Sequence, residues 1–283
     1  MATPFDDSFR RRLEVLKRIV ARAWAGRGGG GRSPISERGG RVEFADHRPY
    51  AAGDDPRNID WAAYARLETL VVKEFEAPRE AHLLLLVDRS ASMDHFGKRE
   101  AALRLAAALG YLGLAAGARV AVAATGGASR WWSGTQAFPE LLTALESLGA
   151  AEADYPRALQ RAPAAGAGRR TAILIGDLYE AEPLARALTA LGRAQRLCVQ
   201  VIAPAEITPP DGVALHVEDA ETGETLEVPL DSAARSRFRA EAERFLEERA
   251  SLAQRHGARF ARVRPEDDLI GAVEQVLLGR AAS

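Results

Sequence analysis

A short polar segment directly after an apolar run has the residues best suited to chemistry in this chain. Asp88, Ser90 and Ser92 form an Asp-x-Ser-x-Ser pattern behind residues 83–87, whose apolar side chains predict a buried parallel strand. In an open α/β sheet, ligands bind outside the carboxyl ends of the strands, where the strand order reverses. One carboxylate and two hydroxyls at such a place can coordinate a hard divalent cation such as Mg²⁺.

This pattern resembles the first loop of the metal-ion-dependent adhesion site of von Willebrand factor A domains. The resemblance implies a third-loop acid, which Asp177 supplies after the apolar residues 171–175. It also implies a second-loop threonine, and that position falls on Ala153, which has no side-chain oxygen, although Asp154 beside it can substitute. Since Mg²⁺ demands good octahedral geometry, we expect weak Mg²⁺ binding or none.

The same loops also have a purely structural interpretation. Ser92 or Asp94 is a suitable N-cap for the helix that follows. Asp177 can bond to the Ser90 hydroxyl and lock the two loops together. A degenerate ion site and a structural lock both remain open from the sequence.

A second motif lies upstream of this segment. It resembles the signature of the DUF58 family, R-x-Y-x-x-G-D-D-x-R-x-I-D-W-x-x-x-A-R, which precedes an A-like domain. The positions that match and that we single out are Arg48, Tyr50, Gly53, Asp54, Asp55, Arg57, Asp60, Trp61 and Arg66. The resemblance implies a bacterial protein that is often encoded beside a MoxR-type AAA+ ATPase, with no known catalytic activity.

The alternating charges of this motif allow two roles. Arginine–carboxylate pairs can clamp an irregular segment onto the A-like domain, which is the interpretation we favour. For such a clamp, we expect loss of Arg57 or Asp60 to cost about 3–5 kcal/mol as a broken buried pair. Alternatively, the acids form a pocket for a basic residue of a partner.

The chain divides into three predicted parts. Residues 1–31 form an amphipathic helix and a Gly-rich linker, residues 32–80 form a DUF58-type extension packed on the sheet, and residues 81–283 form the A-like domain. The helix either packs on the domain or docks on a partner or an anionic membrane surface. Residues 70–76 are expected to be a strand at the sheet edge.

Strand and helix patterns alternate after residue 81. Strands are expected at 83–88, 119–125, 171–177, 196–203 and 258–263, helices at 98–116, 137–148, 182–194, 232–256 and 266–278, and a hairpin at 213–229. This alternation predicts an open, mainly parallel α/β sheet of Rossmann type with helices on both faces.

Composition limits the partners. A net charge of −1 argues against nucleic-acid binding through bulk electrostatics. The single cysteine, Cys198, lies in an apolar run and is expected to be a buried thiol in a reducing compartment. No apolar stretch reaches the ~20 residues that a membrane span needs. Cytoplasmic localisation is therefore expected.

These observations predict a non-enzymatic interaction module, an adaptor that works with a MoxR-type AAA+ ATPase on a client complex. The alternative is a metal-dependent hydrolase that uses the loops of Asp88, Ser90, Ser92 and Asp177. The sequence contains no Walker A motif and no G-x-S-x-G motif, and its five histidines are scattered.

Overall fold

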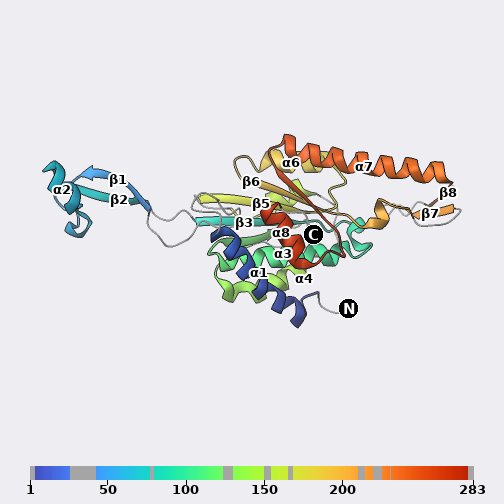
Figure 1. Ribbon diagram of the computed structural model, residues 1–283, viewed down its shortest axis with the longest axis horizontal. Helices are drawn as coiled ribbons and strands as arrows, with labels where there is room; N and C mark the ends of the chain where they lie inside the picture. The colour runs from blue at the N-terminus through green and yellow to red at the C-terminus, as the bar shows by residue number, and fades with distance from the viewer. Residues whose placement is uncertain are drawn as a thin grey trace.

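Five parallel strands form the central sheet, in the order β4-β3-β5-β6-β9. They are β3 (Glu80–Val87), β4 (Arg119–Ala123), β5 (Gly168–Gly176), β6 (Gln195–Val201) and β9 (Arg259–Val263) (Figure 1). This computed structural model describes residues 4–25, 43–76, 80–123, 130–149, 154–164, 168–209, 214–218, 225–229 and 231–279. The five predicted strands and the predicted fold class are confirmed.

The apolar run of β3 is explained by burial on both faces of the sheet. Leu83, Leu85 and Val87 belong to one core cluster, and Leu84 and Leu86 belong to the other. Successive side chains of a strand point to opposite faces. A central strand covered on both sides therefore needs an apolar residue at every position.

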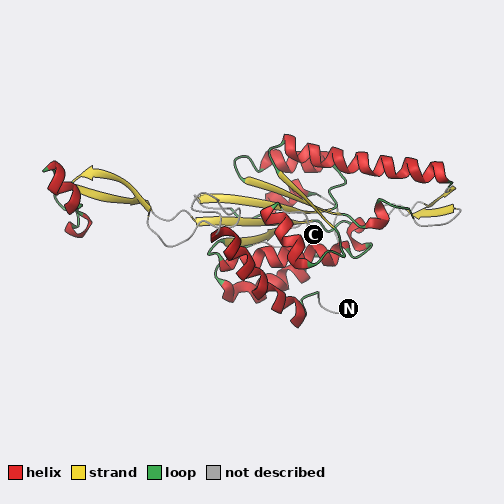
Figure 2. Ribbon diagram, viewed as in Figure 1, coloured by secondary structure: helices red, strands yellow, loops and turns green. Residues whose placement is uncertain are grey.

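Helices cover the two faces of the sheet in separate layers (Figure 2). One core cluster includes residues of α1 (Asp7–Ala25), α3 (Lys98–Ala115), α4 (Phe138–Glu146) and α8 (Leu269–Leu278). The other includes residues of α5 (Tyr155–Arg161), α6 (Ala181–Ala190) and α7 (Ser232–Arg255). All of these helices except α5 were expected from the sequence, within a few residues at their ends.

The helix α1 is part of the α/β domain and not a separate segment. Its apolar side chains Phe9, Leu13, Leu16 and Val20 are buried in the same core as Leu83. It contacts α3 and α8, and Tyr111 of α3 donates a hydrogen bond to Glu14. Of the two interpretations of this helix, the structure therefore supports packing on the domain.

The DUF58-type extension forms a small unit of its own. The strands β1 (Glu43–Pro49) and β2 (Val71–Glu76) pair antiparallel, and between them lie η1 (Pro56–Asn58) and α2 (Trp61–Leu67). The prediction that residues 70–76 join the edge of the main sheet is wrong, because β2 pairs with β1 in a separate two-stranded sheet.

This unit also extends away from the main domain instead of lying on its sheet (Figure 1). Among the described residues, its buried apolar side chains are Ile59, Ala63 and Val72, and neither main core cluster includes them. The unit thus has a small core of its own. We call residues 43–76 the arm.

The predicted hairpin at 213–229 is confirmed as β7 (Ala214–Glu218) and β8 (Thr225–Pro229), which pair antiparallel. It lies with the first turns of α7 beyond the carboxyl ends of the parallel strands (Figure 1). The short helices η2 (Ala91–Asp94), η3 (Thr135–Ala137) and η4 (Pro204–Glu206) complete the described elements. In the described part of the chain, no helix is long and apolar enough to cross a membrane.

Candidate functional site

The loops after β3 and β5 meet at the carboxyl edge of the sheet, where the strand order reverses. From β3 the chain continues to β4 on one side, and β5 lies on the other. The backbone N–H of Asp88 donates to the Ile175 carbonyl at 2.8 Å, which holds the two loops together. This is the position at which open α/β sheets bind ligands.

The structure brings the four predicted site residues together. Ser92 Oγ donates to Asp177 Oδ2 at 2.6 Å, and Ser90 Oγ lies 3.0 Å from Ser92 Oγ. Asp88 accepts a hydrogen bond from the Ser90 backbone N–H at 2.9 Å. Asp88, Ser90 and Asp177 are all buried. The hydroxyls of Ser90 and Ser92 thus connect the first loop to Asp177 of the third loop.

The structural alternative is only partly right. Ser92 bonds to Asp177, whereas the sequence suggested Ser90 for this bond. Neither Ser92 nor Asp94 caps the following helix, because both lie in η2 and α3 begins after Gly97. A turn of three residues separates η2 from the helix, and it could not be seen in the sequence pattern.

The second loop contributes a tyrosine in place of an ion ligand. Tyr155 Oη donates to Asp88 Oδ2 at 3.0 Å. The Asp154 carboxylate instead accepts from the backbone N–H of Arg157 and caps α5. Ala153 lies outside the described residues. The Asp154 carboxylate is thus used as a helix cap in this structure, and no sequence pattern pointed to Tyr155.

Burial and charge shift the pKa values of two groups in this cluster. Burial, and then the nearby Asp177, raise the pKa of Asp88 above its usual value. Burial and the Asp88 charge raise the pKa of Tyr155 well above the usual phenol value, so Tyr155 remains a hydrogen-bond donor. In both groups the raised pKa means that the surroundings disfavour the negatively charged form.

A buried lysine completes the cluster and was missed from the sequence. Lys98, in the first turn of α3, is 0% exposed. Its Nζ lies 3.1 Å from Asp177 Oδ2 and 2.5 Å from Glu206 Oε1 of η4. Tyr179 Oη also donates to Glu206 Oε1, at 2.6 Å. We call Asp88, Ser90, Ser92, Lys98, Tyr155, Asp177, Tyr179 and Glu206 the edge cluster.

Glycine at position 176 permits this close packing. A Cβ there would collide with the Asp88 side chain and with the Tyr155 hydroxyl. Two larger residues near the cluster also have left-handed backbone conformations, Phe96 with φ of 53° and Leu178 with φ of 58°. Such conformations are unusual for bulky residues and concentrate at functional loops.

The signature residues of the arm mostly stabilise the arm itself. Arg48 forms a two-pronged pair with Asp54, with both N–O distances at 2.6 Å. Asp55 caps η1, and Asp60 caps α2 through the backbone N–H groups of Ala62 and Ala63. The described partners of these residues lie within the arm, so the predicted clamp to the A-like domain has no support among the described contacts.

The remaining signature residues have local roles or are exposed. The backbone N–H of Tyr50 bonds to the Leu70 carbonyl, Gly53 has φ of 111°, and Arg66 bonds to the Ala62 carbonyl. Trp61 is 61% exposed and contacts Tyr64 edge-on. Arg57 is exposed and has no ion-pair partner among the described residues. The large cost expected for its removal therefore has no structural basis.

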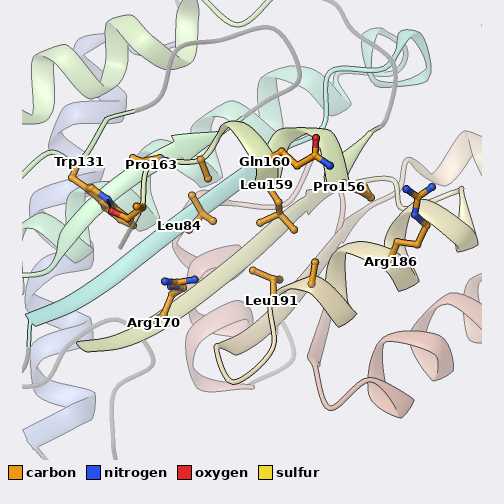
Figure 3. A pocket seen from close by; sticks show the side chains of 12 residues that line it. Leu84, Trp131, Pro156, Leu159, Gln160, Pro163, Arg170, Arg186 and Leu191 are labelled. Carbon is orange, nitrogen blue, oxygen red and sulfur yellow. Dashed lines mark hydrogen bonds between the residues drawn. The ribbon is translucent and has the colours of Figure 1, made fainter. Parts of the chain in front are cut away.

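A cavity of about 420 Å³ lies on the opposite side of β3 from α3, apart from the edge cluster (Figure 3). Leu84, Trp131, Leu159 and Leu191 supply apolar lining, and Arg170 and Arg186 are the charged residues among those described there. None of the described lining residues is an acid, a serine or a cysteine. The cavity therefore does not extend the candidate site.

The chain was compared with known proteins. Residues 46–248, more than half of the chain, match the family model "Protein of unknown function DUF58". The uncharacterized proteins Rv1480 of Mycobacterium tuberculosis (strain ATCC 25618 / H37Rv) and Mb1516 of Mycobacterium bovis are each 31% identical over 210 residues. These matches cover 69% of this chain and 66% of the relatives, so the chain spans just under two thirds of their length.

Among solved structures, BatB from Bacteroides thetaiotaomicron is similar with a TM-score of 0.39 and 13% identity, over 69% of this chain and 96% of that one. An aerotolerance-related membrane protein from Bacteroides fragilis gives 0.35 and 16%, over 62% and 98%. The α/β assignment itself rests on the strand order described above. With the signature of the arm and the parallel α/β sheet in one chain, and a family match that covers the arm and most of the sheet, the protein belongs to the DUF58 family.

Proposed function

We propose that this protein is a non-enzymatic interaction module that binds a MoxR-type AAA+ ATPase through the carboxyl edge of its sheet. In this role it is an adaptor for the assembly or activation of a client complex. The observation that carries the proposal is Phe96. Its aromatic side chain is 60% exposed, and it follows the Asp-x-Ser-x-Ser loop in a left-handed conformation.

The edge cluster holds Phe96 from both sides. The loop begins at Asp88, which Tyr155 and the Ser90 backbone fix, and it ends at Lys98, which bonds to Asp177 and Glu206. Backbone bonds from His95 to Ser92 and from Lys98 to His95 close the turn between them. An exposed aromatic ring on a rigid turn loses little entropy on binding, and such rings are common energetic centres of interfaces.

Further polar groups on the same edge suit a protein partner. A groove of about 470 Å³ runs beside α7, starting two residues after Glu206. Its described lining includes Arg235, Arg239 and Glu243. Mixed charges of this kind are typical of the polar rim of protein interfaces.

The proposed absence of catalysis rests on how the hydroxyls are used. Ser90 and Ser92 bond to each other, and Ser92 bonds to Asp177, which Lys98 already neutralises. A hydroxyl is a weak nucleophile unless a free base activates it. No observation favours the hydrolase alternative, which stays a hypothesis.

The test is co-purification of the protein with a co-encoded MoxR-type AAA+ ATPase, followed by titration calorimetry. Phe96→Ala should weaken association by about 30-fold, equivalent to ~2 kcal/mol for an interface centre. Alanine keeps the Cβ, so the left-handed backbone is not relaxed by this change. The matched control is Trp61→Ala, since Trp61 is equally exposed, at 61%, but lies on the arm.

Each outcome has a defined meaning. Loss of binding in Phe96→Ala with normal binding in Trp61→Ala supports the edge as the interface. The reverse pattern assigns the interface to the arm and refutes the edge model. A wild-type protein that does not associate with the ATPase refutes the proposed function itself.

A further inference from the structure

The surroundings of Lys98 are unusual for a lysine. The chain has 38 basic residues, of which three are lysines, at positions 17, 73 and 98. Lys98 is completely buried, and its ammonium contacts two carboxylates and lies 4.9 Å from the centre of the Tyr179 ring. A buried charge is costly unless it is paired in this way.

The A-like fold raises the question of whether a divalent cation fits at the same loops. Asp177 Oδ2 already accepts hydrogen bonds from Ser92 Oγ and from Lys98 Nζ. Asp88 accepts from the Ser90 backbone and from Tyr155 on its two oxygens. The oxygens that would bind the ion are thus occupied by donors, and a fixed positive charge lies against one of them. These residues do not fit a divalent cation.

We infer that the ammonium of Lys98 replaces the divalent cation of A-like ion sites, so that the edge cluster is complete without metal. The ammonium joins the third loop, through Asp177, to η4, through Glu206. A single internal positive charge thereby holds the third loop against η4 and occupies the oxygen of Asp177 that a bound ion would use. Binding at this edge is then independent of metal.

The choice of lysine agrees with this role. An ammonium is a compact, nearly spherical charge with three donors, whereas the guanidinium of arginine is a planar fork. Arginine occupies nearly every other basic position of this chain. Lysine at this fully buried position matches the compact charge of an ion.

A simple structural ion pair predicts a different result from a cation replacement. If Lys98 only pairs with acids, its removal leaves unpaired carboxylates and no new property. If it replaces a cation, removal creates a site in which Asp177, Glu206 and the two serines offer oxygens to a hard metal ion. The gain of metal binding therefore distinguishes the two roles.

The experiment is Mn²⁺ titration of the full chain, followed by electron paramagnetic resonance and by melting temperature. Lys98→Met should bind Mn²⁺ saturably, at least about tenfold more tightly than wild type, and Mn²⁺ should raise its melting temperature. Asp177→Asn in the Lys98→Met background should abolish the gain. The surface variant Lys17→Met should behave as wild type, and Lys98→Arg should gain no binding because it keeps the charge.

Two results would overturn the inference. One is a folded Lys98→Met protein with no gain in Mn²⁺ binding. The other is wild-type protein that contains or binds a divalent ion at the edge, a measurement that needs no variant. If Lys98→Met does not fold with or without Mn²⁺, the charge-balanced Lys98→Met/Glu206→Gln protein is titrated by the same criteria.

For partner binding, this inference rests on the proposed function. Association of the wild-type protein with the ATPase should be unchanged by EDTA when nucleotide and its Mg²⁺ are omitted. The metal titration uses the isolated protein, so it can fail while partner binding holds, and partner binding can fail while the titration succeeds.

Discussion

At the scale of single residues, Asp54 illustrates how one guanidinium sets the protonation of a surface carboxyl. The hydrogen bonds from Arg48, together with the Ala51 backbone N–H, lower the pKa of Asp54 to about 2. Because the pKa is lower in the folded state, this pair stabilises the arm above the ordinary aspartate pKa. That stabilisation is lost as the pH falls through about 2.

Replacing Arg48 should therefore return Asp54 to ordinary behaviour. In Arg48→Gln, we expect the Asp54 pKa to rise from about 2 toward the usual 3.8, as measured by carboxyl ¹³C NMR titration. Arg57→Gln is the control, since Arg57 is exposed and bonds to Asp55 through its backbone N–H. A low Asp54 pKa that survives loss of Arg48 would show that another group stabilises the carboxylate.

The edge cluster shows what residue patterns can and cannot predict. Asp88, Ser90, Ser92 and Asp177 follow predicted strands directly, so strand order alone brings them together. Lys98, Glu206 and Tyr155 come from a helix, a short 3₁₀ helix and an unpredicted helix. Their convergence depends on packing angles that no local pattern encodes. The one sequence feature that sets Lys98 apart is that lysine is rare in this chain, at three of 38 basic residues.

At the scale of elements, α1 behaves as a core helix with one apolar face. Leu16 is 0% exposed and its neighbour Val15 is 45% exposed. We expect Leu16→Ala to lower the free energy of unfolding by about 2–5 kcal/mol, because it leaves a cavity against α3 and α8. Val15→Ala should change it by about 0.5 kcal/mol or less. Urea denaturation followed by circular dichroism measures both.

Equal effects of these two substitutions would mean that α1 does not remain packed in solution. In that case the partner-docking interpretation of the helix would return. A large effect of Leu16→Ala alone would confirm that α1 is a permanent part of the domain.

Local patterns predicted most helices and strands but not the pairing of the arm. The continuous apolar run of β3 and the apolar face of α1 follow from residue order alone. Apolar and polar residues alternate in residues 70–76 as in an edge strand of any sheet. The pattern therefore could not show that this strand pairs with β1. The helix α2 was not predicted, because its seven residues make too few turns for a helical pattern of apolar side chains to be recognised.

At the scale of the whole molecule, the arm is an insertion within the α/β domain. The domain contains α1 and then resumes at β3, and the end of α1 and the start of β3 lie at the same end of the domain (Figure 1). The arm has its own buried residues, Ile59, Ala63 and Val72. The domain should therefore fold without it.

Replacement of residues 26–79 by a flexible Gly/Ser linker should give a protein that unfolds cooperatively. Shortening a loop changes its closure entropy by only about 0.6 kcal/mol for each halving. The melting temperature and a single calorimetric transition measure the outcome. As a control, the linker protein that also contains Leu16→Ala should have a lower melting temperature than the linker protein alone, because α1 still packs on the domain. Failure of the linker protein to fold would mean that the arm supports the core.

The packing of α1 against α3 and α8 has a consequence for how the protein is made. Synthesis proceeds at ~5–20 residues per second, so the apolar face of α1 waits on the order of 4–15 s for α3 and 10–50 s for α8. During that time Phe9, Leu13, Leu16 and Val20 are exposed on the nascent chain. Chaperones that bind apolar segments at the ribosome should therefore recognise this helix, and slower translation should increase aggregation of the newly made chain.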